Sequence, residues 1–581
     1  MMRTYGFALC MFLLLIVDHA AVDSAHQRSA PTVGGTTTAK SDVASDETAM
    51  LLKALLPEAS GDARARALRH LAKSQDKRFI APLIDLMGFV NAREEYVAIL
   101  QALQTLTGER VDEWENPWEA LTVWYGAHAE LQPPHGYTAW KGELHAQRID
   151  PRFRQFLYDG ALIAVRVEEV VWGGVKVDGI PALVNPRMRP ATEADYLSDD
   201  EPVFGVSING DQRAYPLRIL DWHEMANDVV GGRPVALAYC TLCGSGILYD
   251  ATAAGKTYVF GSSGFLFRSN KLMYDRATYT LWNQLTGEPV IGKLVGRKIK
   301  LTVLPIVLTS WGEWRRQHPD TKAVDLNTGY ERPYQVGATY GRYFASPDTM
   351  FPVWRQSRAL AKKARIFAIQ INGRAKAYQL DALNREGGVV NDTLGSRPLV
   401  VMYRDAVGRV PLPESWQAAL RRHDGADATI ALANDLSLDA ARAVLTAHPS
   451  LVSDMTVEVL LAMPTEARLT LLSERTSNER QGSRARAGMF TPDLRNEVAQ
   501  RGLIGETRAY ERGAHTFTAS RSKEELIDER AAPWRVTEDA LIAPDGERLA
   551  RLGGHLAYWF GWFSFYPQTE LYLNQTTLAP P

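Results

Sequence analysis

The pattern of hydrophobic and polar positions changes once along the chain, close to Pro133–Pro134. Before this point apolar residues recur at helical spacing. After it they form short runs or alternate with polar residues, which is typical of strands. The clearest expected strands are Ala161–Val171, Val203–Ile208 and Val235–Tyr239. The pattern predicts a small helical region followed by a larger β-rich region.

The helical region is expected over residues 47–130. Leucines in Leu51–Leu56 and apolar residues in Ile99–Leu106 follow the helical period, and short polar turns separate such stretches. This arrangement resembles HEAT-like helix pairs. Two interpretations remain open: a surface on which a protein partner docks, or a helical cap on the next domain.

Two segments of the β-rich region repeat each other. Val203–Leu217 (VFGVSINGDQRAYPL) matches Ile366–Leu380 (IFAIQINGRAKAYQL), and both read as strand, Asn-Gly turn and strand. The match continues from Ala226–Tyr239 to Val390–Tyr403, with an offset of 164 residues. An internal repeat of this kind predicts a duplicated β-rich module.

A third match closes each half and locates an insertion. Ser310–Thr321 (SWGEWRRQHPDT) corresponds to Tyr558–Thr569 (YWFGWFSFYPQT), here with an offset of 248 residues. The longer offset implies an insertion of about 84 residues in the second half, expected at about 426–508 and helical in pattern. The paired tryptophans of both segments have helical spacing and are expected in the core.

The predicted fold class is therefore α+β: two similar β-rich halves packed together, preceded by a small α-helical domain and with a helical insertion in the second half. The expected domains are a signal peptide (1–25), a flexible leader (26–46), the helical domain (47–130), a first half (131–345) and a second half (346–575).

The N-terminus predicts export. Arg3 precedes the apolar run Phe7–Val17, and small residues at Ala20–Ala25 offer cleavage positions. The run is short for a membrane helix, and no span is expected after cleavage. We therefore expect a periplasmic or extracellular protein. The formal net charge of -2 gives no reason to expect nucleic acid as a partner.

Export limits the states that the cysteines are expected to adopt. The chain has 3 of them, and cleavage would remove Cys10 with the signal peptide. Cys240 and Cys243 remain as one Cys-x-x-Cys motif after an expected buried strand. In an oxidising compartment such a pair is expected to be a disulfide, a metal site or a redox-active dithiol.

The first interpretation of this pair is a metal site. His223 and Met273 are the best candidates to complete a set with Cys240 and Cys243, and these ligands suit copper better than zinc. The second is a thiol enzyme or redox dithiol, with Cys240 as nucleophile and His223 as its base. The third is a binding module with a static disulfide. His223 has a plainer interpretation as well, a satisfied histidine at the start of a helix over Trp222–Asp228.

Several polar neighbours complete the list of site candidates. Glu224 and Asp228 are expected to orient the ring of His223. Asp275 and Arg276 are expected to form a structural ion pair. Asn227 and Tyr274 stand in the same motifs as these residues.

The motifs that hold these residues resemble a known family. Trp222–Asp228 (WHEMAND), Tyr239–Ser245 (YCTLCGS), Met273–Arg276 (MYDR) and Leu281–Gly287 (LWNQLTG) occur in the order found in the bacterial and archaeal family of domain of unknown function 3179 (DUF3179). The resemblance implies no reaction. This sequence departs from the family pattern at Thr241, where the family usually has proline between the cysteines.

Other chemistries are excluded by motif. The sequence has no P-loop, no dinucleotide-binding fingerprint and no Gly-x-Ser-x-Gly elbow, so no nucleotide cofactor is expected. A c-type haem is excluded because Gly244 follows Cys243 where attachment needs histidine. The second half has Arg404 opposite Cys240 and Gly387 opposite His223, so the chemistry is expected in the first half alone.

Overall fold

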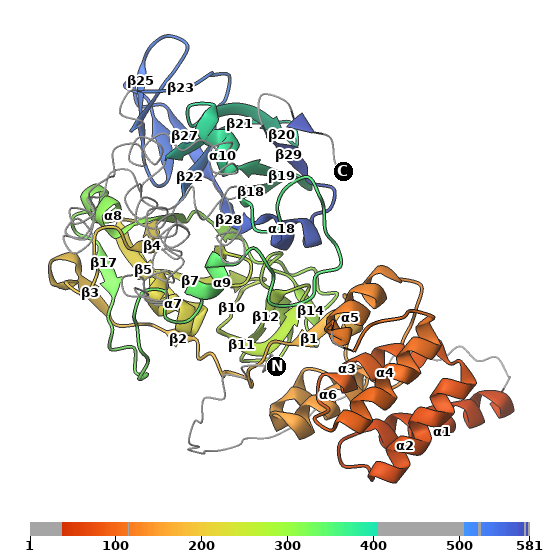
Figure 1. Cartoon of the computed structure of the whole chain (residues 1–581). Coiled ribbons are helices and arrows are strands. Elements are labelled where there is room, and N and C mark those ends of the chain that lie inside the picture. The colour runs from red at the N-terminus through yellow and green to blue at the C-terminus, as the bar shows by residue number, and fades with distance from the viewer. Residues whose placement is uncertain (1–37, 114, 405–504, 521–523, 574–576, 579–581) are drawn as a thin grey trace, which may run out of the picture. The chain divides into compact units, whose positions relative to one another are not determined.

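The computed structural model describes residues 38–113, 115–404, 505–520, 524–573 and 577–578 (Figure 1). The fold is α+β, with an N-terminal helical region followed by many sheets. The chain divides into two units, Met1–Glu47 and Thr48–Pro581, and the description below concerns the second. The expected signal peptide and most of the expected insertion lie outside the described residues. Among the helices within these ranges, none has the length and apolar character that a membrane crossing needs.

The helical region is held together by leucine-rich faces and by side-chain caps. Ser60 accepts a hydrogen bond from the backbone of Ala63, and Asn116 accepts one from Glu119, so two helices begin at capping residues. Its core continues into strand β11 (Phe260–Phe267) through Phe265. The helices are α1 (Thr38–Leu55), α2 (Gly61–Ser74), α3 (Ile80–Met87), α4 (Arg93–Thr107), α5 (Pro117–Ala127) and α6 (Tyr137–Arg148).

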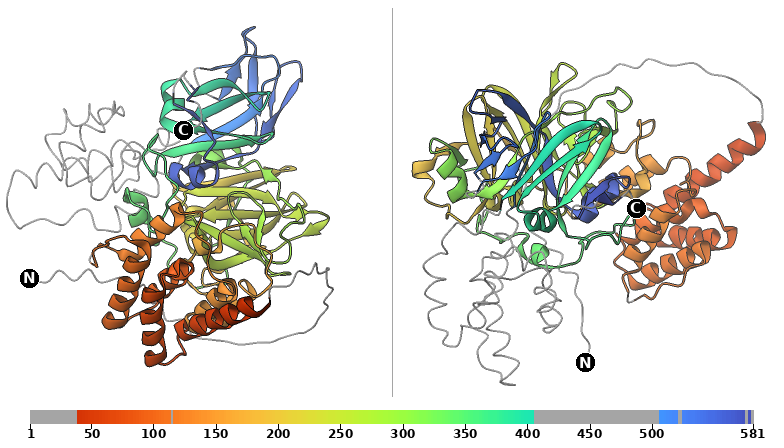
Figure 2. Two further views of the ribbon diagram at one scale, coloured as in Figure 1. Left: turned by 90° about the vertical axis from the view of Figure 1, so that its right-hand side faces the viewer. Right: turned by 90° about the horizontal axis from the view of Figure 1, so that it is seen from above.

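Three sheets of five strands follow the helical region (Figures 1 and 2). The first is β16 (Val307–Ser310), β4 (Pro202–Ile208), β5 (Asp211–Pro216), β17 (Lys322–Val324) and β3 (Met188–Pro190). The second is β15 (Val303–Leu304), β8 (Ser245–Asp250), β7 (Arg233–Cys240), β6 (Met225–Val230) and β2 (Leu183–Val184). The third is β1 (Val170–Trp172), β11 (Phe260–Phe267), β12 (Asn270–Asp275), β13 (Leu281–Asn283) and β14 (Pro289–Ile291).

Two further sheets lie after residue 364. The first is β28 (Gly554–Tyr558), β18 (Arg365–Ile371), β19 (Arg374–Gln379), β29 (Glu570–Tyr572) and β30 (Thr577–Leu578). The second is β20 (Val389–Leu394), β21 (Arg397–Arg404), β22 (Glu506–Glu511), β27 (Arg548–Leu552), β26 (Ala540–Ile542), β25 (Pro533–Val536), β24 (Glu525–Ile527) and β23 (Thr518–Ala519). The remaining short elements are β9 (Thr252–Ala253), β10 (Lys256–Thr257), α7 (Leu217–His223), α8 (Trp311–Gln317), α9 (Gly341–Ala345), α10 (Leu380–Arg385) and α18 (Trp559–Phe565).

The two expected strand–turn–strand segments are present as hairpins. β4 pairs antiparallel with β5, and β18 pairs antiparallel with β19. Each turn is Asn-Gly with both residues at positive φ, 49° and 82° at Asn209–Gly210 and 51° and 75° at Asn372–Gly373. Two positive φ values define the type I′ turn, which matches the twist of the strands. The Asn-Gly pairs were therefore a reliable hairpin signal.

One hydrophobic cluster joins strands from both sides of residue 364. It contains Phe204, Leu237 and Cys243 together with Phe367 and Tyr558, all of them buried. The expected core tryptophans Trp311, Trp314, Trp559 and Trp562 are also buried, in α8 and α18. The Cys-x-x-Cys turn thus lies in a core that both β-rich segments build.

Three details of the sequence prediction are wrong. Ala161–Val171 is not one strand, because only Val170–Trp172 is paired and Ile163 makes a single bridge to Ile291. The helix near His223 ends at that residue instead of starting there, and Met225–Val230 is a strand. Residues 506–508, placed in the insertion, belong to β22. In each case pairing with distant strands outweighs the local pattern.

Candidate functional site

The two cysteines lie on the tight turn between β7 and β8. Cys240 is opposite Ser245 in the antiparallel register, so residues 241–244 make the connection. The backbone N–H of Gly244 donates to the carbonyl of Thr241 at 3.2 Å, and Gly244 has a φ of +56°. Both thiols are free and buried. A glycine at this position allows the chain to fold both sulfurs to the same side.

Hydrogen-bond donors surround the sulfur of Cys240. The side chain of Cys243 and the backbone N–H groups of Lys271 and Cys243 stabilise its charged form. The Cys243 thiol donates to the carbonyl of Ser269 at 3.4 Å, and Asn270 Nδ2 donates to Cys243 Sγ at 3.5 Å. The hairpin turn between β11 and β12 supplies Ser269, and the start of β12 supplies Asn270 and Lys271, so two hairpins from different sheets meet at the thiols.

These contacts distinguish the two cysteines. Burial raises the pKa of the Cys240 thiol, but the hydrogen bonds from Cys243 and from the two backbone amides stabilise its thiolate, and its pKa is lowered overall. Burial raises the pKa of Cys243 well above its ordinary value, and donation to Cys240 raises it further. Cys240 is therefore the thiol of the pair that ionises more readily.

A buried ion pair lies next to the turn and supports it. Lys271 Nζ lies 3.2 Å from Glu224 Oε2, and both side chains are less than 10% exposed. Glu224 also accepts hydrogen bonds from Thr241 Oγ1 at 3.2 Å and from Tyr340 Oη at 3.3 Å. Glu224 has a φ of +53°, a left-handed conformation that costs a non-glycine residue about 1 kcal/mol or more. Its carboxylate is held beside the thiols at the expense of backbone strain.

Segments from beyond residue 340 cover the thiol turn. Tyr343 Oη donates to the carbonyl of Leu242 at 2.7 Å, and the backbone N–H of Tyr558 donates to the carbonyl of Cys243 at 2.7 Å. Gly561 of α18 packs on Cys243 so closely that an added Cβ would lie 3.1 Å from Sγ. Cys240 is 1% exposed and Cys243 is 0% exposed, so a reactant reaches them only when this cover opens.

His223 and Met273 do not converge on the thiols. One ring nitrogen of His223, Nδ1, is 2.7 Å from the carbonyl of Pro181, and the other, Nε2, is 2.6 Å from Tyr334 Oη. These partners, and not Glu224 or Asp228, orient the ring. Burial lowers the pKa of His223 to about 4, so the ring is neutral at pH 7. Met273 packs in a separate core cluster with Trp282.

Asn227 and Asp228 connect strands. Asn227 Nδ2 donates to the carbonyl of Phe260 at 2.9 Å, and the N–H of Phe260 donates back to Asn227 Oδ1 at 2.7 Å. Asp228 Oδ2 accepts hydrogen bonds from Arg213 and from Tyr215 Oη, both at 2.7 Å. These two candidates join β6 to β11 and to β5, and they lie in the scaffold behind the turn.

The expected pair of Asp275 and Arg276 does not form. Arg276 Nη2 lies 3.0 Å from Asp178 Oδ1, and Tyr274 Oη donates to the other oxygen of Asp178 at 2.6 Å. Asp275 accepts instead from Trp282 Nε1 at 3.0 Å and from Thr278. Asp275 is the last residue of β12 and Arg276 begins the turn that follows it, and the two side chains take different partners.

Most of the residues around the thiols could not be predicted from the sequence. Ser269, Asn270, Lys271, Tyr340 and Gly561 come from segments far along the chain, and no local motif connects them to Cys240. Asn270 Oδ1 and Ser269 Oγ are buried oxygens without a protein partner among the described residues, so they are available to a metal ion held by the thiols.

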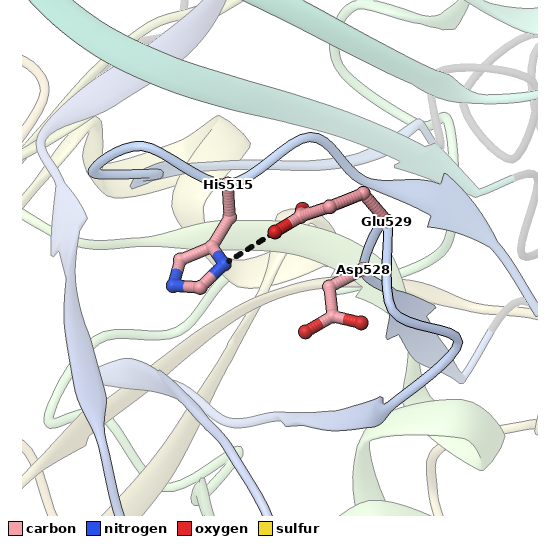
Figure 3. Close-up of side chains that lie close together, drawn as sticks. All are labelled: His515, Asp528 and Glu529. Atoms are coloured by element: carbon pink, nitrogen blue, oxygen red, sulfur yellow. Dashed lines mark hydrogen bonds and ion pairs between the residues drawn. The ribbon is translucent and has the colours of Figure 1, made fainter.

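A second cluster, also missed, lies after β22 (Figure 3). Ligand atoms of His515, Asp528 and Glu529 lie within 4.8 Å of one another. Figure 3 shows the ring of His515 and the carboxylates of Glu529 and Asp528 turned toward a common space. Imidazole and carboxylate are ligands that divalent cations accept. The residues are far enough apart in sequence that no motif spacing reveals them.

The family model described as "Protein of unknown function (DUF3179)" matches residues 177–569. This range covers more than half of the chain and includes both β-rich segments, the thiol turn and the His515 cluster. No curated protein and no solved structure matches significantly.

Proposed function

Because the chain belongs to the DUF3179 family, whose description assigns no activity, we propose a function from its own residues: Cys240 and Cys243 form a covered, redox-active dithiol. The observation that carries the proposal is that two free, buried thiols share one turn in different surroundings. The pKa of Cys240 is lowered by neighbouring donors, whereas burial raises the pKa of Cys243, whose thiol donates to the carbonyl of Ser269. Redox-active Cys-x-x-Cys motifs combine a stabilised thiolate with a partner that is protonated at rest.

The reaction is thiol–disulfide exchange. The Cys240 thiolate attacks one sulfur of a substrate disulfide and forms a mixed disulfide, and the other substrate sulfur leaves as a thiolate that takes up a proton. Cys243 then gives up its proton and attacks Cys240 Sγ. The second substrate thiolate leaves, so the substrate is reduced by two electrons and the protein holds the Cys240–Cys243 disulfide. Asn270 Nδ2, at 3.5 Å, stabilises the thiolate that Cys243 passes through.

We infer that the β-rich region arose by duplication, with one half keeping the chemistry. The supporting observation is that the order β28-β18-β19-β29 has the same pairings as β16-β4-β5-β17, including the parallel pair in each. Side-chain contacts recur as well. Trp314 Nε1 donates to Thr321 at 2.8 Å, and Trp562 Nε1 donates to Thr569 at 2.9 Å.

A metal ion held by the same thiols is a second candidate function. It is favoured by the two unpartnered oxygens beside Cys243, Asn270 Oδ1 and Ser269 Oγ. Two thiolates select copper(I) or zinc. His223 and Met273, the ligands expected from the sequence, are engaged elsewhere, so this version of the site uses oxygen in their place.

Export and a docking role for the helical region complete the proposal. Export rests on Arg3 and the apolar run Phe7–Val17, and an oxidising compartment supplies disulfides as reactants. The helical region α2–α6 is the part proposed to contact a protein partner.

Equilibration in glutathione buffers tests the function. Full-length protein in a chelator is brought to a series of potentials, quenched in acid, alkylated and weighed by mass spectrometry. We expect a single two-electron transition between a form with two thiols and a form with none at residues 240 and 243. Cys243→Ser should stop at a mixed disulfide with glutathione on Cys240. The redox function would be contradicted if the pair stayed reduced at every potential, or if it copurified with stoichiometric metal that blocks alkylation. Either result would favour the metal function.

A further inference from the structure

We propose that His515, Glu529 and Asp528 bind a divalent cation, zinc or manganese in chemical class, and that Glu547 orients the histidine for it. This site lies in the second half and is independent of the thiol chemistry. Its ligands stand at the end of β24 and in the segment between β22 and β23 (Figure 3).

The imidazole has a carboxylate at each nitrogen. His515 Nδ1 is 3.3 Å from Glu529 Oε1, and Nε2 is 3.3 Å from Glu547 Oε2. The ring is 7% exposed, whereas both glutamates are more than 40% exposed. A neutral imidazole has one N–H, so it satisfies one carboxylate and turns its lone pair toward the other.

In this neutral state one carboxylate receives no N–H from the ring, and a cation bound there adds to the charge of Arg530, whose Nε lies 3.5 Å from Glu529 Oε1. When Nε2–H donates to Glu547, the lone pair of Nδ1 faces Glu529, and two electron-rich groups are left 3.3 Å apart. A cation removes this repulsion. A carboxylate on the far nitrogen of a metal-binding histidine is the common supporting arrangement, because it fixes the ring and makes the ligand more basic.

Asp528 supplies a fixed third ligand. Its Oδ1 accepts hydrogen bonds from the backbone of Arg530 and Ala532 at 2.9 and 2.8 Å, and its Oδ2 accepts one from Trp534 Nε1 at 3.2 Å. Four donors would fill the lone pairs of a carboxylate, and three are present, so one site remains for an ion. The carboxylate is held in place before any ion arrives.

The first half keeps only one of the three ligands, the aspartate, at the corresponding place. Asn391 bonds the backbone N–H and carbonyl of Phe517 as Asn227 bonds those of Phe260. Two residues earlier in each case stand His515 and Tyr258, and their rings lie 4.9 and 5.1 Å from Trp534 and Trp282.

The carboxylates differ in the same way. Asp275 and Asp528 both accept from the nearby tryptophan, but Arg276 follows Asp275 where Glu529 follows Asp528. The shared aspartate and tryptophan build the hairpin, whereas histidine and glutamate are present only in the second half. Packing alone is satisfied by tyrosine and arginine, so the difference points to a ligand.

Zinc titration tests the site. The full-length protein carrying Cys240→Ser and Cys243→Ser, which removes the other zinc ligands, is titrated by calorimetry. We expect one zinc ion to bind per chain. Relative to this parent, the zinc affinity should be at least tenfold lower in His515→Tyr and about tenfold lower in Glu547→Gln. His515→Tyr installs the residue of the first half, so it should keep the melting temperature of the metal-free protein.

Manganese provides a second probe, because thiolates bind it poorly. Electron paramagnetic resonance of wild-type protein should show bound manganese that His515→Tyr releases. The proposal is overturned if neither ion binds at millimolar concentration, or if His515→Tyr binds as tightly as its parent. It is also overturned if nuclear magnetic resonance finds His515 doubly protonated and indifferent to either ion.

Discussion

The ends of β7 and β21 show how one backbone arrangement serves two purposes. At the end of β7, Cys240 is paired with Ser245, and at the end of β21, Arg404 is paired with Glu506 in the same antiparallel register. Arg404 Nη2 lies 2.5 Å from Glu506 and 2.7 Å from Glu313, and all three are buried. A buried ion pair can support a strand end but cannot exchange electrons, whereas a pair of thiols can be oxidised and reduced.

The residue whose carbonyl accepts a backbone hydrogen bond next to each strand end shows the same contrast. The backbone N–H of Tyr239 donates to the carbonyl of Glu224, and that of Tyr403 donates to the carbonyl of Gly388. Both acceptors are left-handed, with φ of 53° and 84°. Glycine takes this conformation freely, whereas glutamate does not. Of these two positions only Glu224 is strained, and the strain places a carboxylate beside the thiols, as expected if the first half carries the chemistry.

The largest expected effect concerns the ion pair of the second half. Arg404→Met should lower the free energy of unfolding by about 3 kcal/mol, because it removes the cation that Glu506 and Glu313 share and leaves them only Arg508 and Arg316. Cys240→Ser, nearly isosteric, should cost less than about 2 kcal/mol. Urea unfolding of the two full-length variants measures both. Equal costs would mean that the two strand ends are equally structural.

Local patterns predicted the hairpins, and distant contacts decided the rest. Asn209–Gly210 and the spaced tryptophans carry their structure in short segments, so they could be identified. The Cys-x-x-Cys turn was also visible. Its partners were not, because Lys271 and Gly561 reach Cys240 and Cys243 only through sheet pairing and packing. His223 was misleading because nearness in a motif says little about which face a side chain occupies.

A smaller effect should follow from removing the charge of Glu224. The charge of Glu224 contributes to raising the pKa of Cys240, so Glu224→Gln should move the pH dependence of Cys240 alkylation to lower pH. Tyr340→Phe is the matched control, because it removes a hydrogen bond to Glu224 without changing its charge. A shift to higher pH in Glu224→Gln, or equal shifts in both variants, would show that the carboxylate does not act on the thiolate.

The relative reactivity of Cys240 and Cys243 tests the central claim most directly. Reduced full-length protein in a chelator is treated with iodoacetamide across the pH range, and mass spectrometry follows each cysteine. The same segments cover both thiols, so the rate at which this cover opens cancels in the ratio of the two alkylation rates. Alkylation needs the thiolate, so each rate is lost as pH falls through the pKa of that thiol. The account predicts that Cys240 reacts faster, with a midpoint below the usual thiol value of about 8.5. Equal rates, or a faster Cys243, would contradict it.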